Sequence, residues 1–376
     1  MKELDEKAKK MLLLFGGTIG LIIIIIVISL IVGALKNSSL EYSEIEDKMV
    51  SAAKDYYSKR EDALPLNETE EVEVSAALLV EEGYMKELSK YQKDDSVACE
   101  GKVIVSKSGI YYNYSPYLNC GDKYTTTYLY EEIIDKTVSK DDGLYKTEQY
   151  SKEKGKETVY VYKGDYVDNF IKIDDNLWRI VKVDSNYNMM LIQDYFDREN
   201  GYRGPWDDRY NSANAANTGI NDYYKSVIRN KVNSYYSSDM LSDNLKAKIV
   251  SKDLCVGTRG ANETKKDGSV ECKQVIKGDY LGLLTIYDFM NASLDTNCKK
   301  TTDMNCNNYN YLTNYSNSFW LITADSESTF KGYKFSSGIT QTRLATSGVA
   351  RIVLNITKNS VYVSGNGTYN DPYIIK

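Results

Sequence analysis

The feature that most constrains this chain is an uncharged apolar run at residues 12–35, LLLFGGTIGLIIIIIVISLIVGAL. A helix over these residues is about 36 Å long, which is enough to cross a hydrocarbon core about 30 Å thick. The run is longer than the apolar region of a cleaved signal peptide, and Val32-Gly33-Ala34 is a poor cleavage site. We therefore expect residues 12–35 to form an uncleaved transmembrane helix.

The charges on either side of this run predict its orientation. The segment after the run is rich in carboxylates, and the segment before it carries Lys2, Lys7, Lys9 and Lys10. Basic flanks stay on the cytoplasmic side of a membrane. We expect a cytoplasmic tail at 1–11, a single membrane contact through 12–35, and an extracellular remainder.

Composition excludes several classes of function. The chain has a formal net charge of −6 and no histidine. An acidic chain is not expected to bind nucleic acid, which calls for a basic patch. Without histidine, Ser-His-Asp and Cys-His catalysis and histidine-containing zinc sites are excluded, whereas carboxylate-pair, lysine and cysteine chemistry stay open. We predict neither a cofactor nor a bound metal.

Six cysteines all follow the apolar run. An even number of cysteines in an exported chain predicts disulfides, and six cysteines allow 15 pairings. A metal site is disfavoured because the chain has no Cys-x-x-Cys pair. Pairing between sequence neighbours is the simplest choice, namely Cys99–Cys120, Cys255–Cys272 and Cys298–Cys306.

The first half of the exported part predicts a small membrane-proximal module at 40–128. Apolar residues at helical spacing indicate a helix at 40–60, and a second helix is expected at 73–90. Two strands, at 102–105 and 110–114, flank a turn and predict a hairpin that Cys99 and Cys120 enclose.

A segment dense in Lys, Asp and Glu at 135–156 predicts a solvated linker before a distal domain at 157–376. Helices are expected at 221–252 and 286–292. Strands are expected at 158–162, 170–173, 178–183, 188–192, 280–286, 319–323, 349–355 and 360–363. Helices inserted among antiparallel strands predict an α+β fold.

Residues from about 170 to 376 resemble an uncharacterised surface domain of low-GC Gram-positive bacteria. The matching segments are Leu177-Trp178-Arg179-Ile180-Val181, Trp206, Asn221-Asp222-Tyr223, Leu283-Leu284-Thr285-Ile286-Tyr287-Asp288, Ser318-Phe319-Trp320-Leu321-Ile322, Ser347-Gly348-Val349-Ala350-Arg351, Gly365-Asn366-Gly367-Thr368 and Asp371-Pro372-Tyr373. That domain is similar to the formylglycine-generating-enzyme branch of the C-type-lectin-like fold. The resemblance implies a mixed α+β domain in which Trp178 and Trp320 are core residues first and a binding face second.

Residues 42–125 resemble, more weakly, the soluble head of bacterial pilin-like proteins. The resemblance lies in a helix that leaves the membrane, the segment Leu79–Tyr84, and a hairpin closed by cysteines. It implies an accessory role in a pilus or secretion apparatus as one alternative.

Two short constellations are similar to parts of calcium sites. Trp206-Asp207-Asp208 is similar to the carbonyl-and-carboxylate motif of sugar-binding lectins, with a solvated turn as the alternative. Alternating oxygen-bearing side chains also occur at Asp184, Asn186 and Asn188. Calcium takes about 6–8 oxygen ligands, so the second set is interpreted as a hairpin turn.

Two arginines are further candidate binding residues. Arg343 and Arg351 would fix an anion, with a structural ion pair as the alternative. The first hypothesis for function is a non-catalytic surface protein that binds a glycan or a protein through its distal domain. The alternatives are an enzyme that acts on cell-envelope material through Asp and Glu residues, and an accessory subunit of a pilus or secretion apparatus. The enzyme branch of the similar fold uses a reactive cysteine pair, whereas Cys298 and Cys306 lie in an insert rich in Asn and Lys, which favours the non-catalytic hypothesis.

Overall fold

The computed structural model describes residues 39–94 and 96–376. The expected cytoplasmic tail at 1–11 and transmembrane helix at 12–35 lie outside these residues. None of the described helices combines the length and the apolar character that crossing a bilayer requires. The described chain is a mixed α+β structure with two hydrophobic cores, which confirms the predicted fold class.

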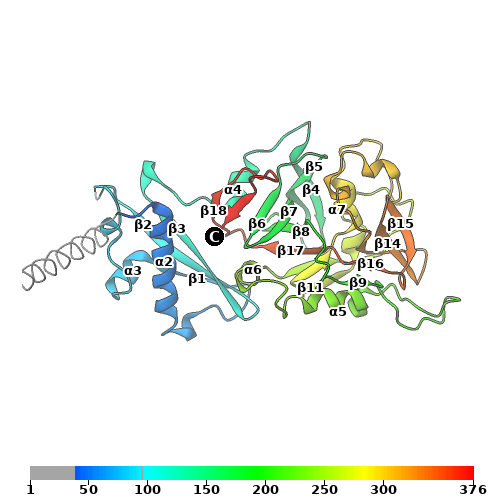
Figure 1. Ribbon diagram of the computed structural model, residues 1–376, viewed down its shortest axis with the longest axis horizontal. Helices are drawn as coiled ribbons and strands as arrows, with labels where there is room; N and C mark the ends of the chain where they lie inside the picture. The colour runs from blue at the N-terminus through cyan, green and yellow to red at the C-terminus, as the bar shows by residue number, and fades with distance from the viewer. Residues whose placement is uncertain (1–38, 95) are drawn as a thin grey trace, which may run out of the picture.

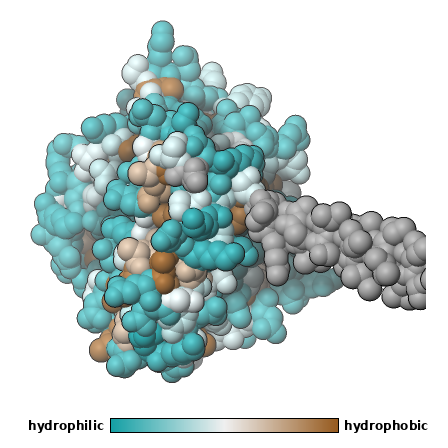
Figure 2. Space-filling model, turned by 90° about the vertical axis from the view of Figure 1, so that its left-hand side faces the viewer, coloured by the Kyte–Doolittle hydropathy of each residue, from teal (hydrophilic) through white to brown (hydrophobic). Residues whose placement is uncertain are grey.

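The first core belongs to a proximal module, in which helices lie against a three-stranded antiparallel sheet at one end of the molecule (Figure 1). Its strands, in order across the sheet, are β1 (Glu71–Ser75), β2 (Glu100–Ser108) and β3 (Tyr111–Asn119). Its helices are α2 (Tyr42–Tyr57) and α3 (Ala76–Glu81), with short 3₁₀ turns η1 (Glu61–Ala63), η2 (Leu88–Lys90) and η3 (Gly121–Lys123). Figure 2 shows the outer face of this module as mainly hydrophilic, with smaller hydrophobic patches between the polar groups.

Helix α2 forms for reasons that are visible in its sequence. The Glu44 carboxylate accepts a hydrogen bond of 2.8 Å from the backbone N–H of Glu41, which satisfies a donor at the start of the helix. Ile45, Met49 and Ala53 recur one turn apart and are buried against the sheet. The helix predicted at 40–60 is therefore confirmed.

The helix predicted at 73–90 is only partly right, since just Ala76–Glu81 forms an α-helix. Residues Glu71–Ser75 form strand β1 instead, because Val72 and Val74 alternate with glutamates that face solvent. Helix α3 starts only after Ser75, whose hydroxyl accepts a hydrogen bond of 3.1 Å from the N–H of Leu78.

The predicted hairpin is confirmed and is longer than expected. Strands β2 and β3 pair along their full lengths, and a disulfide joins Cys99 to Cys120 at the open end of the hairpin. The other two predicted disulfides, Cys255–Cys272 and Cys298–Cys306, are also present. Each bridge closes a short loop within one module.

The second core belongs to the distal part of the chain and is built on a nine-stranded sheet. Along its main path the strand order is β12-β17-β8-β7-β6-β19-β18, with β5 paired to β7 and β4 paired to β5. The strands are β4 (Gly143–Ser151), β5 (Gly155–Lys163), β6 (Phe170–Ile173), β7 (Asn176–Val183), β8 (Met189–Gln193), β12 (Leu281–Leu283), β17 (Ile352–Ile356), β18 (Tyr362–Ser364) and β19 (Tyr373–Ile375). All neighbours are antiparallel except β6 and β19.

A five-stranded sheet lies at the end of the molecule far from the proximal module (Figure 1). Its strands, in order, are β15 (Ile339–Arg343), β14 (Lys331–Phe335), β13 (Phe319–Ala324), β16 (Gly348–Val349) and β9 (Arg203–Gly204). Strands β10 (Lys252–Cys255) and β11 (Val275–Asp279) form a separate pair. The helices of the distal part are α4 (Leu129–Ile134), α5 (Val227–Ser234), α6 (Asp243–Lys248) and α7 (Ile286–Asn291), with turns η4 (Tyr223–Lys225), η5 (Glu271–Lys273), η6 (Met304–Asn307) and η7 (Tyr311–Thr313).

The region predicted to be helical at 221–252 consists of separate short helices. Ser226 caps α5 through a hydrogen bond of 3.2 Å from the N–H of Arg229, and Ser242 caps α6 in the same way through Leu245 at 3.1 Å. Each serine begins a new helix because its hydroxyl satisfies a donor that a continuous helix would bond internally.

The predicted linker at 135–156 is corrected by the structure. Its central part, Gly143–Ser151, is strand β4, which pairs with β5 along its whole length, and β5 joins the nine-stranded sheet through β7. Of the β4 side chains only Leu144 is buried. The strand therefore needs few apolar residues, and its composition is like that of a solvated linker. The backbone ladder, which composition does not reveal, makes it part of the distal domain.

Candidate functional site

The two modules meet where the β2–β3 hairpin reaches the distal part. At its tip, the Ser108 hydroxyl lies 2.9 Å from the hydroxyl of Tyr236, whose ring stacks on that of Tyr280 with centroids 3.9 Å apart. Gly109 has a φ of 55°, and a Cβ at this position would lie 2.8 Å from the Tyr236 hydroxyl, so glycine is required for this close approach. The proximal hairpin is therefore fitted to the distal module.

Further contacts tie the modules together on both sides of the hairpin. The Asn359 side-chain amide donates to the carboxylate of Glu71 at 2.8 Å, and the backbone carbonyl of Asn359 accepts a bond of 2.7 Å from Ser115. The Lys376 ammonium lies 2.8 Å from the buried carboxylate of Glu46 in α2. The modules share a specific polar interface.

A pocket of about 410 Å³ opens within this interface. Its volume lies within the range of about 300–1,000 Å³ that small-ligand sites occupy. It is formed by the segment before β1, by β2, by the β7–β8 turn, by the end of α6 and by the segment after β17. The lining residues are Glu68, Thr69, Glu71, Ser106, Lys107, Asn186, Asn188, Ala247, Lys248, Ile249, Val250, Ser251, Thr357 and Lys358.

Both carboxylates of this interdomain pocket are engaged by the protein. Glu68 accepts a hydrogen bond of 2.9 Å from the N–H of Gly109 and another from the hydroxyl of Tyr280. Burial by itself would raise the pKa of Glu68, but hydrogen bonds from Ser251 and Tyr280 outweigh it and lower that pKa. Glu71 accepts the amide of Asn359. Both carboxylates therefore serve to hold the two modules together.

The three lysines of the pocket have no such partner. No described carboxylate lies within 4 Å of the ammonium group of Lys107, Lys248 or Lys358. Lys107 donates to the carbonyl of Leu66 at 3.0 Å, and Lys248 donates to the side-chain oxygen of Asn113 at 3.4 Å. The pocket thus holds three lysines and two carboxylates, and none of the lysines is in a direct ion pair with a described carboxylate.

Lys248 is the most unusual of the three because it is only 5% exposed. Burial lowers its pKa to about 8, an effect that Lys54 reinforces and that Asp174 opposes. An amine that titrates near neutral pH responds strongly to a bound anion, since an anion restores the charged form.

The oxygen-rich set Asp184, Asn186 and Asn188 forms the β7–β8 turn, as predicted. The Asp184 carboxylate accepts the backbone N–H groups of Asn186 at 2.8 Å and Asn188 at 3.0 Å. Two members of this set, Asn186 and Asn188, line the interdomain pocket. Alternating oxygen-bearing side chains were therefore a partial sequence signal for the site, although the pocket carries no calcium-like cluster.

The motif Trp206-Asp207-Asp208 lies mostly in the interior of the distal part. Trp206 is fully buried and donates from its indole nitrogen to the carbonyl of Leu321 at 3.0 Å. Asp207 is also fully buried and accepts from Arg209 at 2.7 Å, so it is not in a solvated turn either. Only Asp208 is exposed. The motif therefore consists of a buried tryptophan followed by a buried aspartate that pairs with the partly exposed Arg209.

The two arginine candidates lie in different environments. Arg343 is exposed at the end of β15, and Arg351 is buried just before β17. Neither makes an ion pair within 4 Å to a carboxylate of the described residues, so the alternative of a structural ion pair is not borne out for either arginine. Trp178 and Trp320 are buried, which confirms them as core residues.

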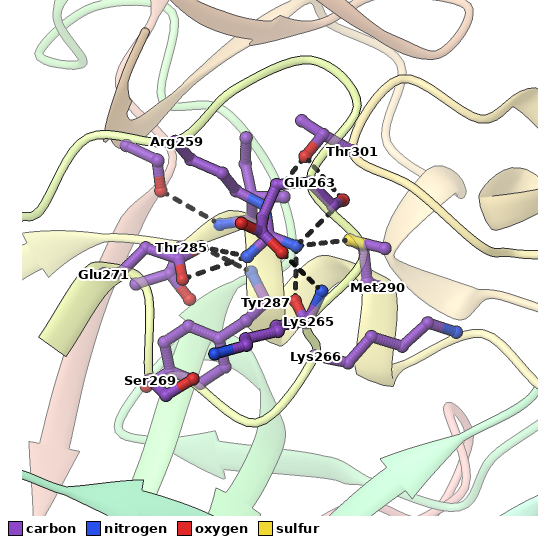
Figure 3. A network of polar contacts seen from close by, with 12 residues as sticks. Arg259, Glu263, Lys265, Lys266, Ser269, Glu271, Thr285, Tyr287, Met290 and Thr301 are labelled. Carbon is purple, nitrogen blue, oxygen red and sulfur yellow. Dashed lines mark hydrogen bonds and ion pairs between the residues drawn. The ribbon is translucent and has the colours of Figure 1, made fainter. Parts of the chain in front are cut away.

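A second polar network surrounds the buried side chains of Arg259 and Glu271 (Figure 3). The Arg259 guanidinium lies 3.1 Å from the Glu271 carboxylate and donates to Thr301 at 2.8 Å. Its remaining nitrogen donates to the backbone carbonyls of Glu263 and Lys265. Because every donor is used by the protein, this network holds the loop between β10 and β11 and leaves no group for a ligand.

The described residues contain no group of three acidic, cysteine or histidine side chains that would hold a metal ion. The lysines and glutamates of the pocket come from segments far apart in the chain, and no spacing in the sequence relates them. Comparisons with family models, with curated proteins and with solved structures find no match to this chain.

Proposed function

We propose that this protein is a membrane-anchored extracellular protein that binds an anionic glycan in the pocket between its two modules. The observation that carries the proposal is the set of three lysines, Lys107, Lys248 and Lys358, that line a polar pocket without a carboxylate partner. An anionic ligand would supply the missing charge. Hydroxyl and amide side chains beside these lysines are suited to the hydroxyl groups of a sugar.

The make-up of the pocket favours an anionic glycan over a neutral one. Aromatic rings usually provide the apolar face on which a neutral sugar stacks, and the pocket lining contains none. Binding is favoured over carboxylate catalysis because Glu68 and Glu71 already accept hydrogen bonds from across the interface. A protein ligand with acidic side chains is the alternative that the same lysines would accept.

The location outside the membrane is part of the same proposal. Three disulfides favour an oxidising compartment, and the basic flank before 12–35 favours a cytoplasmic N-terminus. Protease added to intact cells should degrade the ectodomain and leave an N-terminal tag intact. A tag that is cleaved from outside would reject this orientation.

Residues 170–376 resemble the formylglycine-generating-enzyme branch of the C-type-lectin-like fold, and on that sequence resemblance we propose a distant, non-catalytic member of it. Sugar binding would be compatible with that fold, although the pocket proposed here lies at its boundary with the proximal module.

The test is binding of the full chain, purified in detergent, to arrays of neutral and anionic glycans. We expect the protein to bind anionic glycans and not neutral ones. A Lys107→Gln/Lys358→Gln variant should lose at least about tenfold in affinity for the anionic glycans. Lys172→Gln is the matched control, because Lys172 is an exposed lysine outside the pocket. Equal binding of neutral glycans, or equal loss in the control, would reject the proposal.

A further inference from the structure

A second cationic site lies inside the distal domain, away from the interdomain pocket. Its first member is Arg351, which is only 1% exposed. Its guanidinium donates to two backbone carbonyls, those of Gln193 at 2.8 Å and Leu312 at 3.0 Å. It also lies over the rings of Tyr315 and Phe319, at 4.2 and 5.3 Å from their centroids.

The second member is Arg179 in β7, which is 5% exposed. It donates to the side-chain oxygen of Asn169 at 2.8 Å and lies over Phe170 and Tyr311, at 4.1 and 4.6 Å from their ring centroids. Like Arg351, it has no carboxylate of the described chain within ion-pair distance. Neutral groups hold both cations in place.

Asp194, at the end of β8, is the acidic group that influences both arginines. Burial raises the pKa of Asp194, and the charges of Arg179 and Arg351 oppose this rise without cancelling it. The carboxylate makes no direct bond to either guanidinium within the described structure. Even with Asp194 ionised, two cations face one anion, and burial of an unbalanced charge is unfavourable.

The same site contains two tyrosine hydroxyls without a hydrogen-bond partner in the described chain, those of Tyr311 and Tyr315. Both side chains are buried, since Tyr311 is 0% exposed and Tyr315 is 7% exposed. Each ring carries one of the two guanidinium groups on its face. Buried hydroxyls are almost always hydrogen-bonded. Two buried hydroxyls without a partner beside an excess of positive charge therefore indicate that a hydrogen-bond acceptor is missing.

We propose that Arg179, Arg351, Tyr311 and Tyr315 form a binding site for a carboxylate group. A carboxylate supplies the negative charge and the acceptor oxygens that these residues lack, and its planar shape matches that of guanidinium. Asp194, whose charge acts on both arginines, is half-buried, and the next residue, Tyr195, is 46% exposed. The carboxylate belongs to a small acidic sugar or to the end of a peptide.

The test measures the melting temperature of the full chain in detergent during a titration with sodium acetate. A parallel titration with sodium chloride at the same ionic strength is the reference. We expect acetate to raise the melting temperature saturably, and a Tyr311→Phe/Tyr315→Phe variant to bind acetate about tenfold more weakly or worse. The substitutions remove two hydroxyls and keep the rings under the arginines. Tyr223→Phe is the matched control, because Tyr223 is a buried tyrosine with an unpartnered hydroxyl at another place in the fold.

Two further ligands distinguish the sources of the carboxylate. Stronger binding of glucuronate than of acetate identifies an acidic sugar, and stronger binding of N-acetyl-alanine identifies a peptide end. The proposal is overturned if acetate and chloride act alike, or if Tyr223→Phe weakens acetate binding as much as the double variant does. Its failure leaves the interdomain pocket untouched, because no residue is shared between the two sites.

Discussion

Arg259 and Lys248 are both buried cations, and they differ in how their charges are balanced. Arg259 faces Glu271 at 3.1 Å and uses its other donors on Thr301 and on backbone carbonyls. Lys248 has a single hydrogen bond of 3.4 Å to the neutral side chain of Asn113. Loss of charge is therefore expected to harm the structure at Arg259 and to relieve it at Lys248.

Lys248→Met should stabilise the fold below about pH 8. The folded chain holds Lys248 at a pKa of about 8, below its ordinary value of 10.5, so between these values the unfolded chain binds more protons. The wild type then gains stability as pH rises, by up to roughly 1.4 kcal/mol for each unit of pKa difference. Urea unfolding at pH 7 and pH 10 should show the advantage of the variant shrinking at the higher pH. A constant difference would contradict the shifted pKa.

Arg259→Met should destabilise the distal domain by about 3–5 kcal/mol, because it leaves the Glu271 carboxylate buried and unpaired. Adding Glu271→Gln should restore part of this loss, as the second change removes the orphaned charge. Chemical unfolding of the single and double variants forms a double-mutant cycle. Strict additivity of the two changes would show that the ion pair has no coupling energy.

At the scale of elements, the cysteine loops are local staples within the two modules. The Cys99–Cys120 bridge closes the open end of the β2–β3 hairpin. Cys99→Ser/Cys120→Ser should lower the stability of the proximal module by about 3 kcal/mol, because a loop of this size regains chain entropy when it is opened. Melting curves followed by tyrosine fluorescence would measure this loss. No change in melting would mean that the sheet and α2 hold the hairpin without the bridge.

The sequence predicted some elements closely because their patterns are local. The strand expected at 170–173 has the observed bounds of β6, and the hairpin and all three disulfides were predicted from neighbouring residues. Strand β4 was not predicted because almost none of its side chains is buried. Such a strand does not require the alternation of apolar and polar residues by which strands are recognised in a sequence. The buried Asp207 was missed for a related reason, since only the tertiary structure places Arg209 and the N–H of Ile220 around it.

At the scale of the whole molecule, the modules behave as one unit joined by specific contacts. The charged segment at 135–156 was predicted to be a solvated linker between a proximal module and a distal domain. The structure corrects this prediction, because strands β4 and β5 within and beside this segment pair along their whole lengths. The pocket itself was beyond sequence reasoning, since its walls come from both modules.

We expect limited proteolysis at the exposed turn 152–154 to nick the chain without separating its pieces. Strands β4 and β5 stay hydrogen-bonded along their lengths, and Ser108, Tyr236 and Glu68 hold the modules together. Size-exclusion chromatography of the nicked protein should show one species that denaturing electrophoresis resolves into two. Elution of a separate distal fragment would contradict the coupling of the modules.

The β2–β3 hairpin has a mechanical consequence. One of its ends is closed by a disulfide near α2, and its tip is fitted under Tyr236 in the distal module. A tension between an anchored N-terminus and a ligand in the interdomain pocket would be carried lengthwise along these two strands. Antiparallel hydrogen bonds loaded in this direction share the force in shear, so under the proposed function the hairpin would be a stiff tie between the anchored end and the bound ligand.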